Sequence, residues 1–224
     1  GAGARCFQVV RAKRLREARK KTARLVALGK FGGLSARVAR SSVVAGALFG
    51  VAVTGLQVTH LRQLRTLIHK RVIKRPKGRS ATLDLSRYDG LDPAYIAIGS
   101  PVVMLATALQ DGWLSKTMVA LALKIARDKG VTSVRQAAGP IAVAHTSLHR
   151  MLWTLPDPCR PCEWKCCRGI CVDLMSVSPV CLRKMVGISI EKMLWREAGR
   201  HPSFAHIAQV PLLKPIFKFA STLL

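Results

Sequence analysis

The segment that most constrains the fold is an uncharged run from Ser41 to Thr59, which contains no Asp, Glu, Lys, Arg or His. Its length lies within the roughly 17–25 residues that a membrane-spanning helix needs. Gly46 and Gly50 also have the spacing at which transmembrane helices pack closely. However, the glycines make the run only modestly hydrophobic, and basic residues flank both of its ends, so neither side is marked as cytoplasmic. The run therefore favours a buried core helix over a membrane span.

Positive charge is concentrated on both sides of this run. Residues 1–80 hold 20 Lys and Arg and one acid, Glu17, which gives a net charge of +19. Residues 81–224 hold 17 Lys and Arg and 10 acids, a net charge of +7, so the total is +26. So large an excess repels itself, and binding to a polyanion relieves the repulsion. The charge argues against an ordinary cytosolic metabolic enzyme and indicates a nucleic acid or an anionic surface as the partner.

Two basic amphipathic helices are predicted within residues 1–80. Apolar residues recur every three or four positions over 9–28 and again over 60–73, so each helix has one face to bury. The other faces carry the side chains that we expect to contact a nucleic-acid backbone: Arg14, Arg16, Lys20, Lys21 and Arg24 on the first helix, and Arg62, Arg65, Lys70, Arg71 and Lys74 on the second. Lys and Arg neutralise phosphates without reading sequence. The low aromatic content, 5%, argues against a base-stacking platform. The alternative is a solvated basic face without a specific partner.

The rest of the chain also predicts helices. A capping residue followed by proline, which begins a helix, occurs at Asp92-Pro93, Gly139-Pro140 and Ser178-Pro179. A further helix is expected over 115–129, and Pro211 begins a short one near the C-terminus. Pro101 is expected to kink or divide the helix that starts at Pro93.

Residues 160–174 are the one region that predicts strands, with Arg168-Gly169 as a two-residue turn. The predicted fold is therefore mainly α, a helical bundle with one small β-hairpin near residues 160–174. We expect two parts: a basic helical segment over 1–80, and a helical region over 81–224 that contains the Cys-rich hairpin (159–174) and the C-terminal helices.

Five of the seven cysteines lie within residues 159–171. The candidate ligands for a tetrahedral zinc ion are Cys159, Cys162, Cys166 and Cys171, to which His145 and His149 add two imidazoles. The spacing is poor for a zinc finger, because no second CxxC or HxxxH follows at knuckle distance. The expected hairpin places Cys166 opposite Cys171 and turns Cys167 to the other face, so one metal would not collect four thiolates. We therefore favour small hydrophobic side chains and no cofactor, with zinc as the weaker alternative.

No complete active site is visible in the sequence. The acids include no adjacent carboxylate pair of the kind that a two-metal polymerase or nuclease site uses. The glycine-rich phosphate-binding and dinucleotide-binding motifs are absent. Ser147 lies near His145 and His149, but no oxyanion loop accompanies it. We expect no catalytic residue in this segment.

The order of the motifs resembles one family. The chain has a basic helix followed by the motifs ALFGVAVTGL (47–56) and HLRQLR (60–65). This order resembles the stretch that follows the catalytic palm of LINE-like (non-LTR) retrotransposon reverse transcriptases. In that family, ALYGAEVxGL and LRRLR are the typical motifs. Residues RSATL (79–83) and DPA (92–94) are similar to the GRSxTL and DPA of a subset of these elements. Further similar motifs are Gly139-Pro140, WTLPDP (153–158) and Ser178-Pro179. The resemblance covers about residues 5–200 and rests on the shared order.

Departures from the family pattern limit what is carried over. Phe49 replaces the usual Tyr, Val51-Ala52 replace Ala-Glu, and the palm with its catalytic aspartates is not in this sequence. The resemblance implies a thumb-like, mainly helical, non-catalytic fragment of a polyprotein whose parent is an RNA-directed DNA polymerase. Its implied partners are the RNA or DNA backbone and the palm domain, in a nuclear or cytoplasmic ribonucleoprotein. Two alternatives stay open: a membrane-associated basic protein anchored by 41–59, and a zinc-stabilised interaction module.

Overall fold

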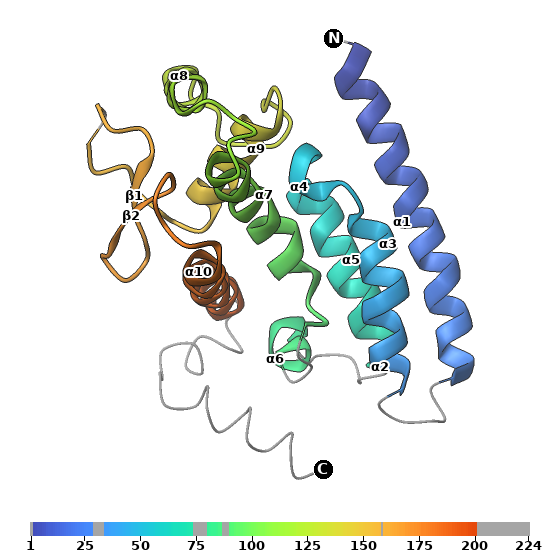
Figure 1. The fold of residues 1–224 in the computed structure, drawn as a ribbon. Helices are drawn as coiled ribbons and strands as arrows, with labels where there is room; N and C mark the ends of the chain where they lie inside the picture. The colour runs from blue at the N-terminus through green and yellow to red at the C-terminus, as the bar shows by residue number, and fades with distance from the viewer. Residues whose placement is uncertain (1, 29–33, 74–79, 87–89, 158, 201–224) are drawn as a thin grey trace. The chain divides into compact units, whose positions relative to one another are not determined.

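The computed structural model describes residues 2–28, 34–73, 80–86, 90–157 and 159–200 (Figure 1). Its contacts divide the chain into two compact units. Unit 1 comprises residues 1–49, 58–93 and 194–224, and unit 2 comprises residues 50–57 and 94–193. The described part is mainly helical with one two-stranded antiparallel sheet, so the predicted fold class is confirmed.

Unit 1 is built around the long helix α1 (Ala2–Leu28), which packs against a broken helical run and against α5 (Val58–Arg71) (Figure 1). The run consists of α2 (Leu34–Val38), the π-helical segment η2 (Ala39–Val44) and α3 (Ala45–Leu48). The short α6 (Ala81–Leu85) packs against α5. The apolar stripes predicted over 9–28 and 60–73 provide buried side chains, among them Ala18, Leu25, Leu61, Leu64 and Ile68.

The uncharged run 41–59 does not form the single core helix that we expected. The helical run ends at Leu48, and the separate α4 (Val51–Thr54) follows. The break has a backbone cause, because Gly50 and Gly55 have φ values of 73° and 63°, in the left-handed region that glycine adopts easily. Residues 41–59 therefore contain the end of one helical run, the short helix α4 and the first residues of α5.

Unit 2 contains α4 and most of α7 (Pro93–Gln110), followed by α8 (Lys116–Asp128), α9 (Pro140–Arg150) and most of α10 (Pro179–Gly199). These helices begin close to their predicted caps. Pro101 lies inside α7 and does not divide it. Within the described ranges, α7 is the one helix long and apolar enough to cross a membrane, and 56% of its apolar window is buried, as in a helix that forms part of a protein core.

The hairpin forms where it was predicted, but in another register. Strand β1 (Glu163–Lys165) pairs with β2 (Cys171–Asp173) so that Trp164 faces Val172. The expected two-residue turn is wrong. The loop spans residues 167–169, with the Cys166 N–H donating to the Ile170 carbonyl at 2.9 Å and Gly169 at φ 83°. A three-residue loop with glycine in the left-handed position is a common alternative, and it places Cys166 opposite Ile170 instead of Cys171.

The division of the chain places residues 81–93 with unit 1, whereas the sequence suggested a boundary near residue 80. The predicted helix at Pro211 lies outside the described residues.

Candidate nucleic-acid interface

The basic side chains of α1 point away from its buried stripe. Ala18, Thr22 and Leu25 are buried, so the positions between them face solvent. The exposed candidates on α1 are Arg16, Lys20, Lys21 and Arg24. Lys20 Nζ lies 3.2 Å from the carboxylate of Glu17, the one acid of this helix. A pair this exposed is weak, so α1 keeps a strongly cationic outer face.

Arg14, the remaining candidate on α1, is half-buried and oriented by its neighbours. One guanidinium nitrogen donates to the carbonyl oxygen of Phe49, and the guanidinium carbon lies 5.2 Å from the centroid of the Phe49 ring. An arginine above an aromatic face gains about 0.5–1 kcal/mol at an exposed site. Phe49 is itself 71% exposed, and it fixes the direction in which this charge points.

A groove of about 360 Å³ lies between α1 and the η2–α3 run, within unit 1. Its polar lining comes from Lys13, Arg14, Glu17, Lys21 and Ser42, so it holds three cations and one carboxylate. Gly46 forms part of its wall, and a Cβ at that position would lie 3.5 Å from Lys21 Nζ. That distance is an ordinary van der Waals contact, so the ammonium group lies close to the backbone of α3. The rest of the lining is apolar, so the groove combines an apolar surface with three cations.

Four of the candidates of the second predicted helix lie on α5, and three of them are exposed: Arg62, Lys70 and Arg71. Lys74 lies outside the described residues. The placement of Arg65 on the outer face is wrong, since that side chain is only 8% exposed. Position 65 borders the buried positions 61, 64 and 68 of the same helix, and this places it at the edge of the packed face.

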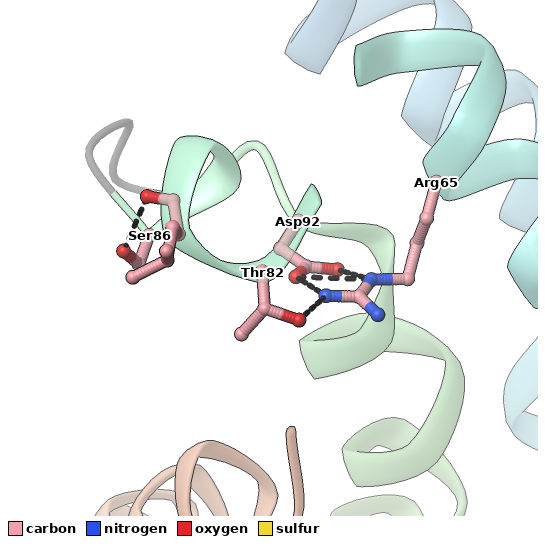
Figure 2. A network of polar contacts seen from close by, with 5 residues as sticks. Arg65, Thr82, Ser86 and Asp92 are labelled. Carbon is pink, nitrogen blue, oxygen red and sulfur yellow. Dashed lines mark hydrogen bonds and ion pairs between the residues drawn. The ribbon is translucent and has the colours of Figure 1, made fainter. Parts of the chain in front are cut away.

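The guanidinium of Arg65 is held by an acid and a hydroxyl from later in the chain (Figure 2). Its Nε lies 3.0 Å from Asp92 Oδ1, its Nη2 lies 2.9 Å from Asp92 Oδ2, and the same Nη2 donates to Thr82 Oγ1 at 3.0 Å. Two parallel bonds to a carboxylate are the strong arrangement for arginine. Arg65 therefore fastens α5 to α6 and to the start of α7, and it is not available to a phosphate.

A second buried contact joins α5 to α6. His69 Nε2 lies 2.8 Å from Asp84 Oδ2, and both side chains are buried. The sequence predicts Asp92 as the capping residue before Pro93 and gives Asp84 no role, although acids are scarce in this chain. Their scarcity was itself a usable signal, because in so basic a chain an acid within an apolar segment has many cations with which to pair.

No family model, no curated protein and no solved structure matches this chain. The case for a function therefore depends on the charges, burial and contacts of these residues.

The four cysteine candidates do not come together as a metal site. Cys159 and Cys171 are exposed, whereas Cys162 and Cys166 are buried. Across the described ranges, no three His, Cys, Asp or Glu side chains are placed to hold a metal ion. Burial, with a smaller contribution from the charge of Asp173, raises the pKa of the Cys162 thiol to about 11. Burial therefore favours the protonated thiol of Cys162 in the folded protein.

Proposed function

We propose that this chain binds the sugar–phosphate backbone of RNA or DNA without sequence preference, as a thumb-like, non-catalytic part of a LINE-type reverse transcriptase. The proposal depends on one observation in unit 1: the same helices have a buried apolar face and an exposed basic face. The helices α1 and α5 bury their apolar faces and leave rows of Lys and Arg exposed. Such a surface is held in shape by its own core, unlike a flexible basic tail.

The physical basis of binding is neutralisation of phosphates with release of condensed counterions. The logarithm of affinity for duplex then falls with the logarithm of salt concentration, by about 0.9 for each phosphate contacted. The seven exposed candidates are Arg16, Lys20, Lys21, Arg24, Arg62, Lys70 and Arg71. If about half of them contact phosphates, we expect a slope of about −3.

The wider setting belongs to the same proposal. Polymerase chemistry would reside in a palm domain elsewhere in the polyprotein, and this segment would hold the primer–template behind it, in a nuclear or cytoplasmic ribonucleoprotein. The support for this setting is the order of motifs from ALFGVAVTGL (47–56) to Ser178-Pro179, together with the positive charge.

The test measures how tightly the full chain binds a fluorescently labelled RNA–DNA duplex. The fluorescence anisotropy of the duplex is recorded at salt concentrations from low to moderate. The test variant carries Lys20→Ala, Lys21→Ala and Arg24→Ala on α1. The control carries Lys116→Ala, Lys124→Ala and Lys129→Ala, three exposed lysines in or next to α8. Both variants lose three charges, so a non-specific effect of net charge acts on them equally.

We expect the α1 variant to bind at least tenfold more weakly and with a shallower salt slope, and the control to bind nearly as the parent does. Absent or salt-insensitive binding, or an equal loss in the two variants, would contradict the proposal.

A further inference from the structure

Two histidines of α9 converge in unit 2. His145 and His149 lie one helical turn apart, and their Nε2 atoms are 3.2 Å from each other. His145 is buried, and His149 is more exposed, although its ring packs edge-on against that of Trp164. Residues four apart lie on the same face of a helix. That spacing alone does not bring two imidazole nitrogens to 3.2 Å, so the orientation of the two rings also matters.

The hydrogen bond at the other side of His145 determines where its lone pair lies. Its Nδ1 is 3.2 Å from the carbonyl oxygen of Val131. A carbonyl only accepts, so Nδ1 carries the hydrogen, and in the neutral ring Nε2 then has its lone pair directed toward His149. Histidines that bind metals commonly donate their second nitrogen to a backbone carbonyl in this manner.

The surroundings of the two rings lower the pKa of each imidazole. Burial, and then the neighbouring His149, lower the pKa of His145 to about 4, and burial lowers the pKa of His149. The charge of Arg127 also lowers the pKa of His145, although Arg127 Nη2 lies 2.8 Å from Asp128 Oδ1, which offsets part of that charge. Neutral imidazole is the form that coordinates a metal.

We propose that His145 and His149 form a two-histidine site for a divalent transition-metal ion, with both Nε2 atoms as ligands and water in the remaining positions. We consider two nitrogens that each lie about 2.0–2.1 Å from one ion, with an N–metal–N angle between the square-planar and the tetrahedral value. These two nitrogens are about 2.9–3.4 Å apart. The observed separation of 3.2 Å lies within that range. Without metal, the Nε2–H of His149 donates to His145. With metal, His149 carries its hydrogen on Nδ1, and no net proton is released.

The site has an open coordination sphere. Among the described residues no third His, Cys, Asp or Glu completes the set, so the affinity should be well below that of a four-ligand structural zinc site. This site is separate from the cysteine cluster considered above, and it does not depend on nucleic-acid binding.

Trp164 provides a built-in reporter. Its ring centroid lies 5.6 Å from that of His145 and 5.4 Å from that of His149, edge-on to both. A paramagnetic ion held by the two imidazoles would therefore quench the fluorescence of this buried tryptophan. Ni²⁺ is the suitable probe, because imidazole suits it, it binds more tightly than Mn²⁺ or Co²⁺, and it does not oxidise thiols as Cu²⁺ does.

The experiment titrates the full chain with Ni²⁺ and follows tryptophan fluorescence and heat of binding together. The test variant is His149→Ala, which removes an exposed side chain and should leave the fold intact. The control is Cys159→Ser with Cys171→Ser, which removes the two exposed thiols of the cysteine cluster. Circular dichroism verifies that each variant is folded, and His149→Gln is the substitute if His149→Ala is not.

We expect one quenching site per chain, weakened at least tenfold in the His149 variant and unchanged in the cysteine variant. Unchanged binding by the His149 variant, loss of binding in the cysteine variant alone, or no quenching of the parent chain would each overturn the proposal.

Discussion

Arg65 and Asp92 form a buried ion pair between residues 27 positions apart, with Nε 3.0 Å from Oδ1 and Nη2 2.9 Å from Oδ2 (Figure 2). The pair joins the basic helix α5 to the residue that precedes α7, and Thr82 of α6 completes it. In a chain with 37 Lys and Arg and 11 acids, two of the acids, Asp84 and Asp92, are used inside unit 1. Because Asp92 is buried together with Arg65, this pair adds no net charge to the surface, and the exposed Lys and Arg of α1 and α5 provide its positive charge.

The first prediction concerns this pair. Arg65→Met should lower the free energy of unfolding by about 3 kcal/mol, because it leaves the Asp92 carboxylate buried without its partner. Arg62→Met changes the same kind of residue at an exposed position of the same helix and should cost less than about 0.5 kcal/mol. Urea denaturation of the two variants measures the difference. Equal costs would show that the buried pair contributes nothing specific.

The second prediction concerns Gly55, where the chain turns from α4 toward α5. A Cβ here would lie 2.8 Å from Val143 Cγ1 and 2.9 Å from Val134 Cγ1, at a backbone φ of +63°. Gly55→Ala should therefore lower the free energy of unfolding by about 3 kcal/mol, through steric overlap and backbone strain together.

The matched control for Gly55 is Gly187, which lies inside α10, where an added Cβ would have no neighbouring atom within 4 Å. Gly187→Ala should raise the free energy of unfolding by about 0.5–1 kcal/mol, because alanine loses less conformational freedom in a helix. Thermal denaturation of both variants decides the point. A stabilising Gly55→Ala would mean that the loop relaxes easily and that its left-handed backbone is not required.

The third prediction is a pH dependence. Burial raises the pKa of Cys162 from about 9 to about 11, so the folded protein holds this proton more tightly than the unfolded chain does. The resulting stability is fully present below pH 9 and is lost as the pH rises from 9 through 11, by about 3 kcal/mol at most. Cys162→Ala should lack this dependence.

The check is urea denaturation at several pH values between 8 and 11, with Cys162→Ala measured in parallel so that other titrating groups cancel in the difference. Alkylation provides a second readout. At pH 8 the exposed Cys159 and Cys171 should react quickly with iodoacetamide and Cys162 slowly, because thiolate is the reactive form. Equal rates for the three thiols would contradict the buried placement of Cys162.

The helices were predictable from sequence because their signals are local. The cap-plus-proline pair at Gly139-Pro140 begins α9, and the periodic apolar residues of 9–28 predict the buried stripe of α1. The sequence wrongly predicts Arg65 as an exposed residue. Helical periodicity shows that position 65 lies at the edge of the buried face of its helix, but it does not show which residues of other elements pack against it. Its partner Asp92 is 27 positions away, and a pairing over that distance depends on tertiary structure.

The predictions for the run 41–59 and for the hairpin loop are wrong for local reasons that residue composition does not show. The run 41–59 has the apolar character of one helix, but the left-handed backbone at Gly50 and Gly55 divides it. In the hairpin, Arg168-Gly169 fits either a two-residue or a three-residue loop, and a change of one residue in loop length alters every cross-strand pair. The convergence of His145 and His149 is consistent with their i, i+4 spacing, but the carbonyl of Val131 that orients His145 was not visible in the sequence.

The last prediction tests the groove between α1 and α3. Gly46→Asp places a carboxylate close to Lys21 Nζ, which lies 3.5 Å from the position that a Cβ would take at residue 46, so one cation of the proposed phosphate-binding surface becomes paired. The affinity for an RNA–DNA duplex at low salt should fall about threefold to fivefold, equivalent to about 1 kcal/mol, and the difference should shrink as salt screens it. Gly187→Asp introduces the same charge in unit 2 and should leave the affinity nearly unchanged. Equal losses in the two variants would indicate that only the net charge of the chain matters, and that the groove contributes no local contact.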